Sequence, residues 1–278
     1  MFEKLLSIDR RIIFIFVAVA LILPLFLNIS QYIAISPEVS KIYDGLEELK
    51  PGSKVLFAFD YDPPSAPELQ PMAEAVLKYC FKNKLKVYII GLWPQGPMQA
   101  NLAIEVIRDD PQFADTPPVY DQNYVNLGFM SGNELVIQGM GSSFQSTFPR
   151  DYQGTPTADL EMMNGVNNFS NIDYIFNLSA GYPGTVEWVL FAVDRFHATL
   201  GAGNTAVQAP QIYPYFHAGQ LQGLAGGLKG AAELEKLVGF YGKGTKFMLS
   251  QSFAHLTVIF FIIIGNIAYF ATRGKKKQ

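Results

Sequence analysis

Two long apolar segments, one near each end of the chain, limit what this polypeptide can fold into. No polar side chain occurs from Ile12 to Leu27, and only three interrupt the run from Phe253 to Ala271. A helix needs ~20 mostly apolar residues to cross the hydrocarbon core of a bilayer. We therefore expect two transmembrane helices, over residues 12–33 and 250–272, with a kink at Pro24 in the first. The first segment is longer than the apolar core of a signal peptide, so we expect it to be retained.

Basic residues flank both segments on the side of the chain termini. Residues 1–11 and 273–278 carry seven basic and two acidic residues, which leaves 14 of the 21 basic and 22 of the 24 acidic residues between them, a net charge of −8. Positive residues beside a span stay in the cytoplasm, so we expect both tails to be cytoplasmic, in a cell membrane, and the domain to be extracytoplasmic. This negative charge argues against nucleic acid as a partner, because nucleic acid binds to clustered Lys and Arg. An amphipathic segment, 34–52, is expected to form a stalk helix leading into the domain.

The region between the apolar segments alternates between strand and helix patterns. Continuous apolar runs at Lys54–Asp60 and Leu85–Gly91 are typical of buried parallel strands. Helical spacing of apolar residues follows each run, at Pro67–Lys82 and Met98–Arg108. This alternation predicts a three-layer, Rossmann-like α/β domain over 53–249, with a mostly parallel sheet of five or six strands.

The rest of the domain is less regular. We expect two short strands at Tyr124–Phe129 and Glu134–Gln138, separated by a glycine turn. A further strand is predicted at Ile172–Leu178, a helix at Gly184–Leu200 and a last strand at Asn204–Gln208.

A glycine-rich segment, 215–238, precedes the second apolar run and is predicted to be helical. Small residues recur every four positions, at Gly219, Gly223, Gly227 and Ala231. Each glycine inside a helix costs ~1 kcal/mol relative to alanine, so packing must compensate. Such a face could pack on the domain's own sheet or stalk, or it could dock another subunit. Alternatively, Gly226 and Gly227 break the segment, so that it is not one helix.

Asp60 and Asp62 are the first candidates for chemistry, because they follow the first predicted strand directly. Carboxylate oxygens suit Mg²⁺, so a metal-dependent hydrolase or phosphatase centred on this pair is one hypothesis. Pro63 and Pro64 come next in the chain and favour a structured turn instead.

Two further loops are candidates for ligand binding. The first contains Gly139, Gly141, Ser142 and Ser143, whose backbone amides could hold an anion. The second contains Ser179 and Gly181, but Asn177 stands where a nucleophile elbow needs glycine. Three scattered histidines and one cysteine match no common zinc pattern, so we predict no metal and no cofactor.

Loops after parallel strands meet at one edge of a sheet, where α/β folds bind ligands. Here they are rich in Gly, Pro, Ser and aromatic residues, which suits a contact surface better than a catalytic centre. In the second apolar segment, Asn266 is expected to bond to another helix. We therefore favour a non-enzymatic membrane subunit that scaffolds or regulates a larger assembly, with other membrane proteins or a second copy as partners. The alternatives are an extracytoplasmic solute- or nucleotide-binding sensor domain and the metal-dependent hydrolase.

Overall fold

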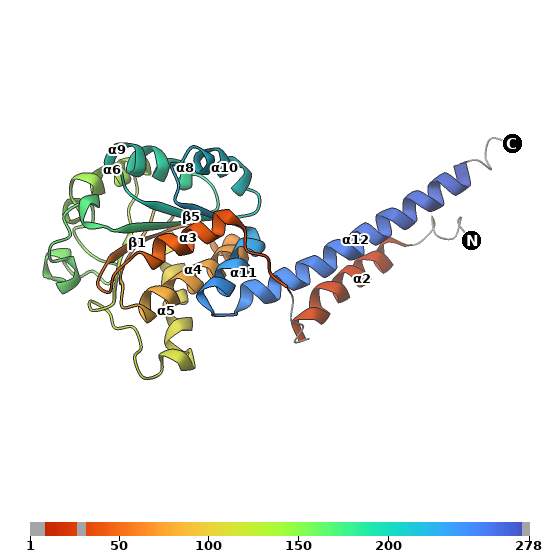
Figure 1. Cartoon of the computed structure of the whole chain (residues 1–278), viewed down its shortest axis with the longest axis horizontal. Helices are drawn as coiled ribbons and strands as arrows, with labels where there is room; N and C mark the ends of the chain where they lie inside the picture. The colour runs from red at the N-terminus through yellow and green to blue at the C-terminus, as the bar shows by residue number, and fades with distance from the viewer. Residues whose placement is uncertain (1–8, 27–31, 274–278) are drawn as a thin grey trace. The chain divides into compact units, whose positions relative to one another are not determined.

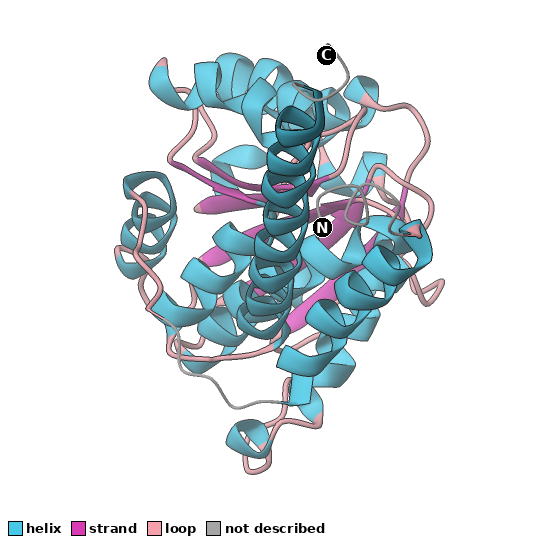
Figure 2. Ribbon diagram, turned by 90° about the vertical axis from the view of Figure 1, so that its right-hand side faces the viewer, coloured by secondary structure: helices cyan, strands magenta, loops and turns pink. Residues whose placement is uncertain are grey.

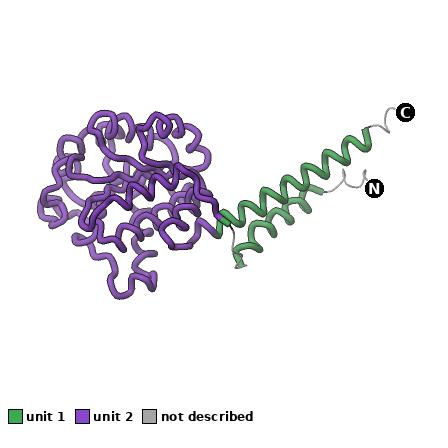
Figure 3. Tube along the Cα trace, in the orientation of Figure 1, with its two compact units in different colours: residues 1–32, 246–278 green, residues 33–245 purple. Residues whose placement is uncertain are grey.

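The computed structural model of this chain describes residues 9–26 and 32–273. It divides into two compact units, coloured separately in Figure 3. Unit 1 combines the two ends of the chain, 1–32 and 246–278, and unit 2 comprises 33–245. The division falls inside the last helix, α12 (Lys243–Arg273).

Unit 2 is built on six strands that are all parallel and lie in the order β3-β2-β1-β4-β5-β6. This is the order of the doubly wound sheets that bind dinucleotides. The strands are β1 (Lys54–Asp60), β2 (Lys86–Gly91), β3 (Tyr124–Phe129), β4 (Tyr174–Ser179), β5 (Leu200–Asn204) and β6 (Gly223–Gly226).

Helices cover both faces of this sheet (Figures 1 and 2), because alternate strand residues point to opposite sides. Phe57 and Phe59 join the core on one face, and Leu56 and Ala58 join the core on the other. The first face is covered by α3 (Pro37–Glu47), α4 (Ala66–Lys82), α5 (Gly96–Arg108) and α11 (Gly227–Val238). The second is covered by α6 (Glu134–Ser142), α7 (Phe144–Thr147), α8 (Thr185–Trp188), the π-helix η7 (Val189–Val193) and α10 (Ala209–His217).

Short helical segments complete the fold. They are α9 (Asp194–Phe196) and the 3-10 turns η2 (Pro63–Ser65), η3 (Pro111–Phe113), η4 (Thr157–Asp159), η5 (Glu161–Met163) and η6 (Phe169–Asn171). The predicted α/β class with a parallel sheet is therefore confirmed. β1, β2, β3, α4 and α5 each begin and end within two residues of the predicted bounds.

Two strand predictions are wrong. The predicted strand at Glu134–Gln138 is the start of helix α6. Val136, Ile137 and Met140 are buried on one side of that helix. The spacing of apolar residues in so short a run does not distinguish a helix from a strand. The predicted last strand also lies too late in the chain, because β5 ends at Asn204, where that strand was expected to begin.

The glycine-rich segment 215–238 is not one helix. It contains the end of α10, the strand β6 and helix α11, which confirms the alternative that Gly226 and Gly227 break it. Gly219 (φ +78°) lies in the turn after α10, and Gly227 (φ +59°) begins α11. Both adopt the left-handed conformation that glycine tolerates best. The four small residues therefore do not share one helical face.

The other two small residues, Gly223 and Ala231, are packed inside unit 2. A Cβ on Gly223, in β6, would stand 2.5 Å from the backbone nitrogen of Ile42, so the missing side chain lets α3 approach the strand. Ala231 is buried in α11. The segment 34–52, expected as a stalk, holds α3 and lies within unit 2, where that helix contributes to the core.

Helix α11 forms hydrogen bonds to the chain both where it enters unit 2 and where it leaves unit 2. Oε2 of Glu233 accepts hydrogen bonds from the backbone N–H (2.9 Å) and the hydroxyl (2.5 Å) of Ser36. Glu235 accepts bonds from the backbone N–H groups of Gly244 (2.7 Å) and Thr245 (2.8 Å), in the first turn of α12. A carboxylate at the N-terminus of a helix satisfies amides that lack partners within the helix.

Unit 1 pairs α2 (Arg10–Ile22) with the greater part of α12, and the rings of Phe16 and Phe261 meet edge to face at 5.7 Å. The 31 residues of α12 span about 46 Å and are apolar enough to cross a membrane. No N-terminal helix among the described residues reaches that length. The 13-residue α2, about 20 Å long, gives way to the 3-10 turn η1 (Leu23–Phe26) at Pro24.

The first predicted span is therefore not found in the described part of the chain. Residues 27–31 of that span, 1–8 of the N-terminal tail and 274–278 of the C-terminal tail lie outside the described residues.

Candidate functional site at the carboxyl edge of the sheet

Asp60, the last residue of β1, is the buried centre of the carboxyl edge. Its Oδ1 accepts a hydrogen bond from the backbone N–H of Leu92 at 2.8 Å. Its Oδ2 accepts two more, from the amide Nδ2 of Asn177 at 2.7 Å and from the indole N–H of Trp188 at 2.8 Å. Both carboxylate oxygens are thus bonded to donors of the protein, and the side chain is fully buried.

Parallel register brings these groups together. Asp60 pairs with Ser179 of β4, and Ser179 pairs with Asn204 of β5, so the ends of three adjacent strands lie level. Asp60 and Asn177 belong to the face that buries Trp188. Between β1 and β4 the strand order reverses, and in open α/β sheets this is the point where ligands bind.

A chain of hydrogen bonds continues from Asn177 across the edge. The hydroxyl of Thr185 donates to Oδ1 of Asn177 (2.6 Å) and accepts from Nδ2 of Asn204 (2.8 Å). Nδ2 of Asn204 also donates to Oε1 of Gln208 (3.0 Å), whose Nε2 donates to the carbonyl of Gly181 (3.1 Å). Side chains from β1, β4, β5 and α8 therefore form one buried polar network.

Burial raises the pKa of Asp60 from 3.8 to about 7, since a charged carboxylate is costly away from water. The hydrogen bonds from Leu92, Trp188 and Asn177 act in the opposite direction by stabilising the charged form, and nearby Glu187 raises the pKa further. The pKa of this fully buried carboxyl therefore lies near neutral pH.

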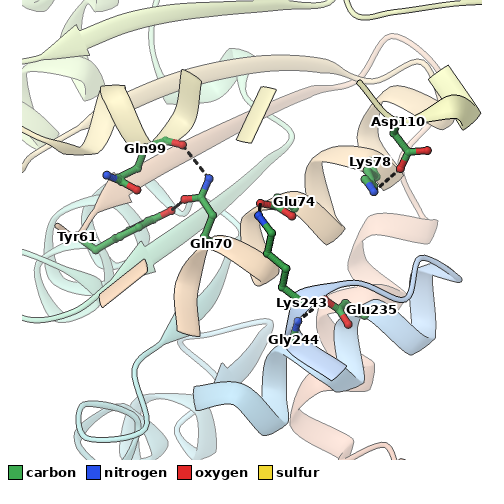
Figure 4. A network of polar contacts seen from close by, with 9 residues as sticks. All are labelled: Tyr61, Gln70, Glu74, Lys78, Gln99, Asp110, Glu235, Lys243 and Gly244. Atoms are coloured by element: carbon green, nitrogen blue, oxygen red, sulfur yellow. Dashed lines mark hydrogen bonds and ion pairs between the residues drawn. The ribbon is translucent and has the colours of Figure 1, made fainter. Parts of the chain in front are cut away.

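Asp62 does not share this environment. Its Oδ1 accepts a bond from the hydroxyl of Ser65 at 3.0 Å, within the turn that begins α4. Tyr61, between the two aspartates, is buried on the opposite face. Its hydroxyl donates to Gln70 of α4 at 2.6 Å, and the side-chain amide of Gln70 donates to the carbonyl of Gln99 in α5 (Figure 4). Within residues 9–26 and 32–273, no three His, Cys, Asp or Glu side chains are placed to hold a metal ion. Asp60, whose two oxygens already accept three hydrogen bonds from the protein, does not fit the role of metal ligand.

Ser179 and Gly181 form a tight turn after β4. The buried Ser179 hydroxyl donates to the carbonyl of Gly181 at 3.2 Å. A Cβ on Gly184 would stand 1.9 Å from that hydroxyl oxygen, so the turn is closely packed. The hydroxyl is thus part of the turn, as expected for a chain that lacks the full elbow pattern.

The predicted loop Gly139–Ser143 is not a strand-end loop. Gly139, Gly141 and Ser142 lie within α6, because the preceding strand is replaced by that helix. A Cβ on Gly141 would stand 2.1 Å from the ring of Phe196, which shows that this glycine allows close packing. The hydroxyl of Ser143 accepts a bond from the N–H of Ser146 and caps α7.

Asn266, predicted to bond to another helix, donates from Nδ2 to the carbonyl of Ile262 one turn earlier in α12, at 2.9 Å. The hydrogen bond observed for this amide is therefore within its own helix.

Exposed apolar side chains surround the buried network, and we call Trp93, Leu135, Tyr182 and Val207 the edge surface. Leu135, Tyr182 and Val207 are 69%, 63% and 91% exposed, while Trp93 is half-buried. The hydroxyl of Tyr182 donates to Glu134, next to Leu135, and the indole N–H of Trp93 donates to the carbonyl of Pro183 (2.8 Å). Gln208, next to Val207, bonds to Gly181. These contacts hold together the chain segments that carry the four residues.

No protein-family model, curated protein or solved structure matches this chain.

Proposed function

We propose that this chain is a non-enzymatic subunit, anchored in a membrane by its apolar ends, whose α/β domain contacts another membrane protein and scaffolds or regulates that assembly. The observation that carries the proposal is the filled carboxyl edge. Asp60, Asn177 and Trp188 bond to one another at the position where a sheet of this order holds its ligand. A ligand there would have to displace bonds that the protein has already made.

The edge surface supports contact with a protein. It combines two aromatic and two aliphatic side chains, three of them well exposed, next to a rigid buried network. Aromatic side chains at the centre of an interface contribute much of the binding energy. The solute-sensor alternative places a ligand on these same strand-end loops, whose polar atoms are largely bonded to one another.

The apolar helices support the membrane anchor. α2 and α12 expose large apolar side chains such as Phe14, Phe260 and Phe270, which a bilayer would cover. Arg10 and Arg11 begin α2 and Arg273 ends α12, and the positive-inside rule then gives cytoplasmic termini and an extracytoplasmic unit 2.

The test of the contact is the size of the particle in mild detergent. The wild-type chain is expected to purify in a complex larger than a monomer. The double variant Leu135→Gln with Tyr182→Gln is expected to shrink that complex. The matched control, Leu102→Gln with Tyr213→Gln, also changes one exposed Leu and one exposed Tyr, but both lie outside the edge surface. This control is expected to leave the complex intact. The mass of the complex distinguishes a second copy from a different protein. A strictly monomeric wild type, or equal effects of the two pairs, contradicts the proposal.

Topology is tested by labelling single cysteines in intact cells with a membrane-impermeant maleimide. The native Cys80 is fully buried and gives little background. Gln112→Cys, on an exposed turn of unit 2, is expected to react from outside. Lys276→Cys is expected to react only after the cells are permeabilised. The reverse pattern contradicts the proposed orientation.

A further inference from the structure

A cavity of about 640 Å³ lies at the amino ends of β1, β2 and β3, the opposite edge of the sheet from Asp60. Backbone hydrogen bonds hold its rim together: the N–H of Gly52 donates to the carbonyl of Lys84, and the N–H of Lys86 donates to Ser53. The turn before β1 is thereby fixed to the turn before β2. Cavities of this size are typical of small-molecule sites.

The charge of this cavity is opposite to that of the domain around it. Residues 33–245 contain 13 Lys and Arg against 22 Asp and Glu, a net charge of −9. Three of those lysines, Lys82, Lys84 and Lys86, line the cavity, and no acidic residue does. The Lys86 ammonium donates to the carbonyl of Gln122, and within the described chain none of the three is in an ion pair with a carboxylate.

Lys84 occupies a backbone position where glycine would be more stable. It follows α4 with φ +58°, and the bonds from Lys84 N–H to Phe81 and from Leu85 N–H to Cys80 form the usual closing turn of a helix. The left-handed conformation at this turn disfavours a residue with a Cβ. A strained residue at the rim of a cavity points to a role for its side chain.

The floor of the cavity is apolar and aromatic. Phe113 and Phe240 are almost fully buried there, with their ring centres 6.3 Å apart, and Phe81 lines the wall beside them. The ammonium of Lys82 lies 5.3 Å from the centre of the Phe240 ring. A ligand would thus meet flat apolar rings and ammonium groups at once.

We propose that this cavity binds a small, soluble organic phosphate that carries a flat ring. A phosphate monoester bears nearly two negative charges at neutral pH, which suits a cavity lined by three lysines and no acidic residue better than a single carboxylate does. The ring would rest on the phenylalanine floor. The adjoining cavity, which shares Gly52 and Lys86, includes Asp121 and Glu161 and is less suited to an anion. This inference concerns the edge opposite the proposed protein contact and does not depend on that contact.

The binding test is calorimetry with the full chain in nanodiscs of zwitterionic lipid, which keeps anionic headgroups out of the cavity. Three compounds separate the contributions: 1-naphthyl phosphate, inorganic phosphate and 2-naphthol, with titrations into empty nanodiscs subtracted. Naphthyl phosphate is expected to bind at least tenfold more tightly than either of the others, and more weakly as salt is added. Binding no tighter than that of inorganic phosphate, or no heat beyond that of empty nanodiscs, overturns the proposal.

Variants locate the site. Lys82→Gln with Lys84→Gln is expected to weaken naphthyl phosphate binding at least tenfold. Lys41→Gln with Lys246→Gln removes the same charge from exposed positions elsewhere and is expected to change binding less than twofold. Lys84→Gly is expected to raise the thermal midpoint while weakening binding at least threefold, a combination that general damage to the fold does not produce. Equal losses in the two lysine pairs, or full binding by Lys84→Gly, overturn the assignment.

Discussion

At the carboxyl edge of the sheet the buried side chain of Asp60 accepts hydrogen bonds from three donors of the protein, whereas at the amino edge three lysines line an open cavity. In most open α/β sheets the carboxyl edge binds the ligand. Here that edge has solvent-exposed apolar residues around a closed polar network, and the space and charge suited to a small molecule lie on the other side. Strand order alone therefore does not locate a binding site; the side chains at each edge decide it.

The largest expected effect comes from removing the centre of the closed edge. Asp60→Ala leaves the Leu92 N–H, the Trp188 N–H and the Asn177 amide without their acceptor inside the protein. Each unsatisfied buried donor costs about 1–3 kcal/mol, so we expect a loss of about 4 kcal/mol in the free energy of unfolding. Chemical denaturation of the detergent-solubilised chain, followed by tryptophan emission, measures it. A loss below about 1 kcal/mol would mean that the network is not a rigid unit.

The pH dependence of stability tests the same carboxyl. In the native state Asp60 keeps its proton up to about pH 7, whereas the unfolded chain loses it near pH 3.8. The unfolded state therefore binds fewer protons between these values, and the free energy of unfolding falls as pH rises from about 4 to about 7, by about 4 kcal/mol. Asp60→Asn is expected to lack this component of the slope, because it does not titrate. Identical slopes for the two proteins would assign the titration to another group.

Two glycines compare how closely the two edges are packed. Gly184→Ala at the carboxyl edge places a Cβ 1.9 Å from the hydroxyl oxygen of Ser179, and we expect a loss of about 2–3 kcal/mol from overpacking. Gly52→Ala at the amino edge meets no atom within 4 Å and costs only its strained φ of +90°, about 1 kcal/mol. Thermal midpoints of both variants measure the difference. Equal shifts would show that the two edges are packed alike.

The smallest expected effect is that of the lysines on stability in the absence of ligand. Lys82→Gln with Lys84→Gln is expected to change the free energy of unfolding by no more than about 0.5 kcal/mol, because exposed charges contribute little to folding. The contact of Lys82 with the Phe240 ring accounts for most of that amount. The same denaturation assay measures it. A loss above about 2 kcal/mol would make these lysines part of the fold and would remove the contrast with Asp60.

The first half of the fold is predictable because its signals are local and unambiguous. β1 is a continuous apolar run that is buried on both faces, and α4 repeats its apolar residues at helical spacing over 17 residues. The predicted strand in the region of α6 is wrong because its nine residues fit both the helical period and the strand period. The prediction of one helix over the glycine-rich segment is wrong because small residues four positions apart also occur in a turn, a strand and the start of a helix.

The candidate site could be located only in part. Asp60 is predictable because it ends a buried strand, but its partner Trp188 comes 128 residues later and no local pattern joins them. In the sequence, Asn177 stands out only as a departure from the elbow pattern. The pairing of Asp60 with Asp62 was suggested by adjacency, yet alternation along the chain sends intervening Tyr61 to the opposite face and leaves Asp62 in a turn.

Two carboxylates on α11 have a mechanical consequence. Glu233 holds Ser36, and Glu235, two residues later, holds Gly244 and Thr245. Tension applied to the chain at either connection is therefore transmitted to one helix, which packs closely against α4. Opposed pulls on the two connections would load the same short stretch of α11, between Glu233 and Glu235.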